Sequence, residues 1–79
     1  MMAISLEKIH QYLKQSGWTF SIFLPNLCKI IKEIEGEETV LIIPYTINLR
    51  DYEYRISLLI KALAIIEETS AEKIVEKIG

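Results

Sequence analysis

Hydrophobic residues repeat with two different periods along the chain, and this change of period limits the possible folds. Leu6, Ile9 and Leu13 follow Met2 at the spacing of one helix face. Alternate residues of segment 18–24 form one apolar side, which is typical of a half-buried strand. Helical spacing returns in the second half of the chain. The pattern therefore predicts a protein of the α+β class.

The first helix has clear predicted ends. Ser5 is a good N-cap, and Glu7 lies in the first turn, where the helix dipole favours an acidic side chain. Ile4 can pack against Ile9 as a hydrophobic staple. Gly17 supplies the left-handed residue that commonly follows a helix.

Residues 27–35 fit two secondary structures. As a helix, they place four apolar residues on one face, and Gly36 follows. As a strand, they lead through a turn at Gly36 into the next strand, residues 39–43, which Pro44 ends. A helix here would leave an isolated two-stranded parallel pair, an uncommon arrangement in a short chain. We therefore favour the strand, which gives a three-stranded antiparallel meander.

The rest of the chain predicts two helices. Asn48 is the expected N-cap of a long helix that runs to about Glu68 without a glycine or proline. Thr69 is the expected cap of a short last helix, and Glu72 three residues later completes a capping box. We predict a single domain, residues 1–79, with the order α-β-β-β-α-α: an N-terminal helix, the three-stranded meander, a long helix and a short C-terminal helix.

The chain has few means of stabilising a small core other than apolar packing. Its 79 residues allow one core, and a core of this size is usually only marginally stable. Cys28 is the only cysteine and His10 the only histidine, so a disulfide within one chain is impossible and a four-ligand zinc site is nearly excluded. Self-association is the remaining means of stabilisation.

The long helix carries two apolar lines, and this is the most informative feature of the sequence. A helix that covers one face of a sheet needs a single apolar stripe. The broad line consists of Leu49, Tyr52, Ile56, Leu59, Ile60, Leu63 and Ile66. The second line consists of Tyr54, Leu58, Ala62 and Ile65. Either another helix of the same chain or a partner subunit could cover the second line, and we predict that it is the interface of a homodimer.

The sequence contains no recognisable catalytic, cofactor or metal site. Cys28, His10 and Asp51 could be assembled into a nucleophilic triad, but no glycine-rich elbow or oxyanion motif accompanies them. We interpret Cys28 as a small buried residue and His10 as a half-exposed helix residue. Four acidic residues around Gly36 predict a solvated turn rather than a calcium loop: Glu33, Glu35, Glu37 and Glu38.

The charge and hydropathy of the chain indicate which classes of partner it binds. Nine basic residues are scattered among eleven acidic ones, for a net charge of −2, so we expect neither nucleic acid nor a membrane as the main partner. The most apolar segment, residues 56–66, has about half the length of a membrane span and contains Lys61. The first six residues lack the basic and apolar regions of a signal peptide. With one unpaired cysteine, these features predict a cytoplasmic protein.

Residues 39–78 resemble a ribbon-helix-helix repressor or antitoxin. The similarity is strongest in residues 64–75, where Glu-Glu-Thr-Ser resembles the turn between that family's two helices. The resemblance implies an intertwined dimer that reads DNA with polar or basic side chains on the exposed strand face. Here the strand Val40-Leu41-Ile42-Ile43 is apolar on both faces. A nucleic-acid-binding regulator of this type is therefore the alternative function and not the one that we favour.

The whole chain also resembles a type of small, functionally uncharacterised bacterial α+β protein. The resemblance lies in Ser16-Gly17-Trp18, in Ile42-Ile43-Pro44 at the end of a strand, and in the Arg-Asp-Tyr-Glu-Tyr-Arg-Ile run of residues 50–56. These motifs are structural and imply no chemistry. The sequence predicts a non-enzymatic protein-interaction module that is homodimeric, regulatory or antitoxin-like, and able to bind another cytoplasmic protein.

Overall fold

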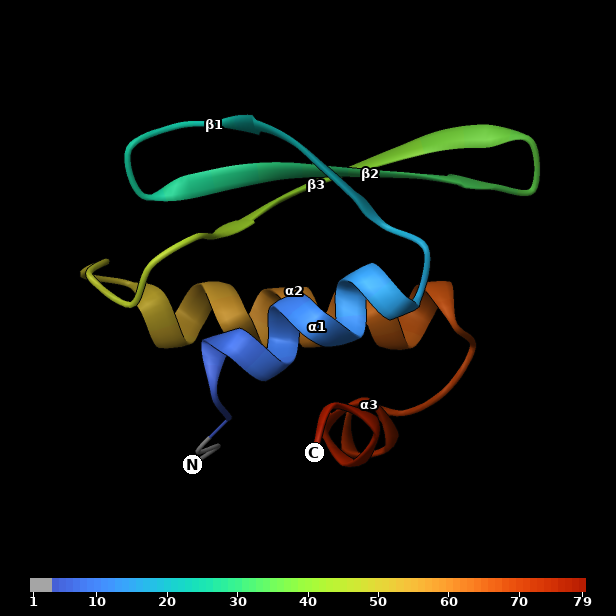
Figure 1. The fold of residues 1–79 in the computed structure, drawn as a ribbon. Helices are drawn as coiled ribbons and strands as arrows, with labels where there is room; N and C mark the ends of the chain where they lie inside the picture. Colours follow the sequence, from blue (N-terminus) through green and yellow to red (C-terminus); the bar gives the residue numbers. More distant parts are fainter. Residues whose placement is uncertain (1–3) are drawn as a thin grey trace.

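The computed structural model describes residues 4–79 and has the predicted order of elements. They are α1 (Leu6–Gln15), β1 (Thr19–Phe23), β2 (Leu27–Ile34), β3 (Glu37–Pro44), α2 (Tyr52–Ile66) and α3 (Ala71–Ile78). The sheet has the strand order β1-β2-β3 and forms one layer, with the helices together on one side of it (Figure 1). α1 and α2 lie nearest the sheet, and α3 lies beyond them. No helix within residues 4–79 has the length and apolar character needed to cross a membrane.

α1 begins and ends where the sequence predicts. The Ser5 hydroxyl accepts a hydrogen bond from the Lys8 backbone N–H at 3.3 Å, which caps the helix. Ile4 packs against the core beside this cap. Gly17 has a φ of 95°, the left-handed conformation in which the chain leaves the helix. Met2, the first member of the predicted apolar stripe, lies outside the described residues.

Residues 27–35 form a strand and the start of a turn, so the strand prediction is confirmed and the helical alternative is wrong. β2 pairs with β3 without interruption over the full length of both strands. Glu35 and Gly36 join them with φ values of 52° and 83°, as in the tight two-residue turns of hairpins. On its other edge β2 pairs with β1, whose register shifts between Phe20 and Phe23. β2 is thus the central strand.

The core lies between the sheet and the helices. Side chains of a strand alternate between its two faces: Cys28, Ile30 and Ile43 are at most 1% exposed, whereas Val40 and Ile42 are 41% and 48% exposed. Burying one aliphatic side chain contributes about 1.5–3 kcal/mol, so this layer is the main source of stability. Its helical members are Ile9, Leu13, Ile56, Leu59, Ile60, Leu63, Ala64, Ile74 and Ile78.

α2 begins at Tyr52 and not directly after Asn48, so the predicted N-cap is wrong. Asn48 belongs to an earlier turn, because its backbone N–H donates to the Thr46 hydroxyl at 2.9 Å. A further turn follows, in which the Tyr52 N–H donates to the Leu49 carbonyl at 3.2 Å. Asp51 then occupies the N-cap position.

α3 is capped by Ser70 and not by Thr69. The Ser70 hydroxyl accepts from the Lys73 backbone N–H at 3.2 Å. Thr69 instead closes α2, because its backbone N–H donates to the Ala64 carbonyl at 2.8 Å. The predicted cap is therefore one residue too early, and the N3 position that we assigned to Glu72 is held by Lys73.

A single substitution tests the end of α2. Glu68 lies just beyond the helix with a φ of 55°, a conformation that glycine adopts without the steric cost of a Cβ. Glu68→Gly is expected to raise the free energy of unfolding by about 0.5–1 kcal/mol. The matched control, Glu53→Gly on the exposed first turn of α2, should lower it by a similar amount. Urea unfolding measures both, and destabilisation by Glu68→Gly would contradict this account.

Candidate interaction surface

The four predicted interface residues lie on the solvent side of α2. Tyr54, Leu58 and Ile65 are 65%, 46% and 78% exposed, and Ala62 is half-buried. Within residues 4–79 no helix covers this line, so the alternative that the chain's own helices bury it is wrong. The opposite side of α2 packs into the core. A single chain therefore leaves an aromatic and aliphatic line in contact with water.

The edge of the sheet continues this line. β3 is an outer strand of the sheet, and a hollow of about 190 Å³ separates it from α2. The hollow is lined by Leu41, Ile42, Arg55, Leu58, Leu59 and Ala62. We call the exposed residues Ile42, Tyr54, Leu58 and Ile65, together with the half-buried Ala62, the α2–β3 band. Sequence analysis identified the α2 part of the band but not the strand beside it.

The charged residue of this hollow has a partner of its own. The Arg55 guanidinium donates to both carboxylate oxygens of Asp51 at 3.1 Å, one helical turn earlier. Such exposed pairs add little to stability. In this hollow the pair has a local effect. Asp51 balances the charge of Arg55, so the lining of the hollow stays suited to an apolar contact.

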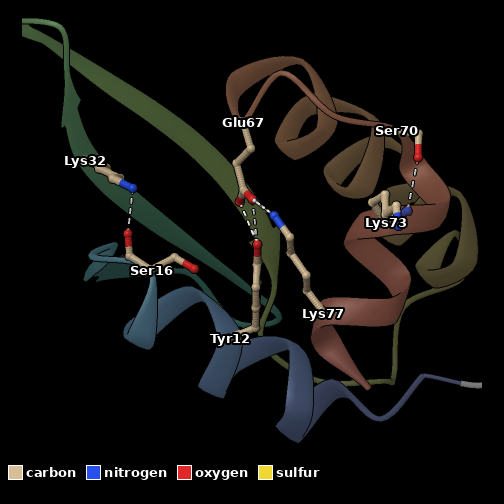
Figure 2. Close-up of polar contacts among 7 residues, drawn as sticks. All are labelled: Tyr12, Ser16, Lys32, Glu67, Ser70, Lys73 and Lys77. Carbon is tan, nitrogen blue, oxygen red and sulfur yellow. Dashed lines mark hydrogen bonds and ion pairs between the residues drawn. The ribbon is translucent and has the colours of Figure 1, made fainter.

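A polar junction joins the three helices at the other end of α2 (Figure 2). The Tyr12 hydroxyl of α1 donates to Oε1 and Oε2 of Glu67 at 2.7 and 2.8 Å, and Lys77 of α3 binds Oε1 at 3.3 Å. Nearby, Lys32 of β2 donates to the Ser16 carbonyl at the end of α1 at 2.6 Å. Sequence analysis missed this junction, because Tyr12 and Glu67 lie 55 positions apart. The junction holds the helix that carries the band in a defined place.

The junction predicts a loss of stability at alkaline pH. Partial burial and the adjacent Glu67 carboxylate raise the pKa of Tyr12 from 10.0 to about 12. The folded protein therefore keeps this proton at pH values where the unfolded chain loses it, so the stabilisation is complete below pH 10 and is lost as the pH rises through about 12. Tyr12→Phe should lower the free energy of unfolding by about 1–2 kcal/mol at neutral pH and flatten its decline above pH 10.

The control for this measurement is Tyr52→Phe. Burial alone raises the pKa of Tyr52, and no carboxylate partner accounts for the shift. Its phenylalanine variant should therefore cost less stability at neutral pH than Tyr12→Phe. Unfolding curves at a series of pH values check both variants, and equal losses would show that the Glu67 contact contributes nothing.

His10 connects α1 to the end of β3. Its Nε2 donates to the Pro44 carbonyl at 3.1 Å, because a carbonyl oxygen can only accept. The imidazole stacks on Tyr45, with 5.5 Å between ring centroids, and meets the edge of Phe20 at 5.2 Å. Phe23 also packs against the Tyr45 ring in an edge-to-face arrangement, with 4.9 Å between ring centroids. These contacts place His10 in a packing role.

The three residues considered for a triad have separate partners. Cys28 is fully buried in β2, and its Sγ donates to the Lys29 carbonyl at 3.5 Å. Burial raises the pKa of the Cys28 thiol, which disfavours the thiolate that a nucleophile needs. His10 binds Pro44 and Asp51 binds Arg55. No hydrogen bond among the described residues joins the three to one another.

We expect Cys28 to be structural. Cys28→Val should lower the free energy of unfolding by at most about 1–2 kcal/mol. In the wild type, a thiol reagent should label Cys28 at least about a hundredfold more slowly under native conditions than in denaturant, because the thiol reacts only when the core opens. Equal labelling rates in the two conditions would show that the thiol is accessible in the folded protein.

The acidic residues of the β2–β3 turn form a solvated cluster. Glu33, Glu35, Glu37 and Glu38 are all exposed, and Glu33 lies directly opposite Glu38 in the ladder. Like charges in such positions repel. Within residues 4–79 no group of acidic, histidine or cysteine side chains is arranged to hold a metal ion.

Two of the other hollows among residues 4–79 lie outside the α2–β3 band. One, of about 360 Å³, runs between α2 and α3 and is lined by Ser57, Ile60, Lys61, Ala71, Glu72 and Val75. The other, of about 480 Å³, lies beside His10 and Tyr45. Every buried side-chain nitrogen or oxygen in the described part of the chain has a hydrogen-bond partner.

Comparison with protein-family models, curated proteins and solved structures gave no match. The α2–β3 band is therefore the feature from which a function can be proposed.

Proposed function

We propose that this chain is a non-enzymatic protein-interaction module that works as a homodimer through the α2–β3 band. One observation carries the proposal: the second apolar line of α2 remains exposed although the broad apolar line of the same helix is packed in the core. Burying such a line adds a larger fraction to the stability of a small domain than to that of a large one, because the core of a small domain is limited. In this account a regulatory role would belong to the dimer, which presents its remaining surface to another cytoplasmic protein.

The residues of the band are suited to this role. Aromatic and aliphatic side chains dominate the centres of protein interfaces. Tyr54, Leu58 and Ile65 each have about half or more of their surface still to bury, which contributes on the order of 1 kcal/mol per side chain. Counted over both subunits, the gain is several kcal/mol before the cost of association.

A charge in the middle of the α2 line tests the homodimer. Leu58→Glu should place two carboxylates in the contact, one from each subunit, and so produce a monomer. We expect light scattering at tens of micromolar, above a micromolar dissociation constant, to give the mass of a dimer for the wild type and of one chain for Leu58→Glu. The melting temperature of the variant should be lower and independent of concentration.

The matched control is Leu24→Glu in the β1–β2 turn. Leu24 has the same side chain and is 53% exposed, close to the 46% of Leu58, but it lies outside the α2–β3 band. This variant should remain a dimer. A monomeric wild type, or equal effects of the two substitutions, would contradict the proposed function.

A further inference from the structure

The two outer edges of the sheet differ in how well they are protected. Outer strands expose unpaired backbone groups, and proteins commonly shield them by short length, bulges, charges or prolines. β1 has five residues and a register shift between Phe20 and Phe23. β3 has eight residues in unbroken register. Glu38 and Pro44 protect only the ends of β3, and its centre has Val40 and Ile42, 41% and 48% exposed.

The β2–β3 turn determines which backbone groups of β3 are free. In a two-residue hairpin, the residues that flank the turn form the first hydrogen-bonded pair, and such pairs recur at every second position. Here the first pair is Ile34 with Glu37. Glu38, Val40 and Ile42 therefore direct their backbone N–H and C=O groups away from β2 toward the open edge. The missing N–H of Pro44 falls on the same side.

We propose that β3 pairs antiparallel with β3 of a second copy of this chain, joining two three-stranded sheets into one of six strands. This inference rests on the proposed homodimer and states how its subunits meet. Val40 and Ile42 form the central ladder between the subunits. The α2 line, which lies beside this edge across the hollow, packs at the same time against the α2 line of the second copy.

Charge favours the antiparallel arrangement. The four exposed glutamates of the β2–β3 turn lie at one end of β3. Parallel pairing would bring the two acidic turns together, and like charges side by side are destabilising. Antiparallel pairing places each acidic turn near the Pro44 end of the other copy. Two-fold symmetry, the commonest symmetry of dimers, gives this arrangement directly.

The combined surface is about twice as large as the α2 line alone. The eight residues of β3 span about 26 Å, and the 15 residues of α2 span about 22 Å. A strand layer and a helix are each about 10 Å thick, so the joint face covers roughly 480 Å² in flat projection. This is more than half of the roughly 800 Å² per partner of a standard interface. α2 alone supplies about half of that face.

Cysteine cross-linking tests the pairing and its register. The variants Val40→Cys, Leu41→Cys and Ile42→Cys are each made singly in a Cys28→Val background. Each tests one register, in which the two-fold axis passes through that residue and the cysteine lies opposite its own copy in the second chain. Directly opposed residues of antiparallel strands have Cα atoms about 4.5–5.5 Å apart, which is within the Cα separations of disulfides. Under mild oxidation we expect one of the three to form a covalent dimer at least tenfold faster than Thr19→Cys, which lies on the other edge of the sheet. No enhancement in any of them would overturn strand pairing.

A second measurement needs no substitution. Hydrogen exchange by NMR should show the Val40 and Ile42 amides of the wild type protected at concentrations where the dimer forms and exposed on dilution or in Leu58→Glu. Fast exchange of these amides in a wild type that light scattering shows to be a dimer would overturn strand pairing and leave the proposed homodimer intact. A monomeric wild type would overturn both proposals and leave the edge for a strand of another protein.

Discussion

Because β2 has a paired neighbour on each side, its alternation determines which side chains of the whole sheet face the helices. Cys28 and Ile30 of this strand are completely buried, and Ile43 joins them from the paired position on β3. The helices cover only that face (Figure 1). A shift of β2 by one residue would turn these side chains to solvent. The place of α2, and with it the exposed line, therefore depends on the register of β2.

Much of the fold could be predicted because hydrophobic period is a local property. The helical and strand periods gave the element order, and the need of one strand for an antiparallel neighbour resolved the ambiguity at residues 27–35. The helix caps were harder, since adjacent residues such as Thr69 and Ser70 can both cap. The hydrogen bond of the Thr69 backbone to Ala64 determines which one does, and such a bond is visible only in three dimensions.

The part of the candidate site that lies on one helix could also be predicted from the sequence. The spacing of Tyr54, Leu58 and Ile65 identified the α2 line, since it needs only a helical wheel. The contribution of β3 could not be predicted, because it depends on which edge of the sheet lies next to α2. The contact between Tyr12 and Glu67 joins helices that are distant in sequence, and neither residue belongs to a motif.

The packed and exposed sides of α2 divide the residues of the core from those of the proposed interface. Ile56, Leu59 and Leu63 belong to the core of one chain, whereas Leu58 and Ile65 contribute little to it. Substitutions on the exposed side can therefore alter the quaternary structure while the tertiary structure persists. In the proposed homodimer, this arrangement would let the small core of a 79-residue domain gain stability from a second copy while the folded chain keeps its own core.

The junction of Tyr12, Glu67 and Lys77 also has a kinetic consequence. The β2–β3 hairpin closes over two residues, so its contacts form with little loss of chain entropy. α1 and α3 come from opposite ends of the chain, as the bond from Lys8 to the Gly79 carbonyl illustrates at a separation of 71 positions, so contacts between them close the longest loops and cost the most chain entropy. We expect such contacts to form after the folding transition state, in which case their strength sets the unfolding rate rather than the folding rate. The junction would then slow unfolding, and its strength would determine the lifetime of the folded state.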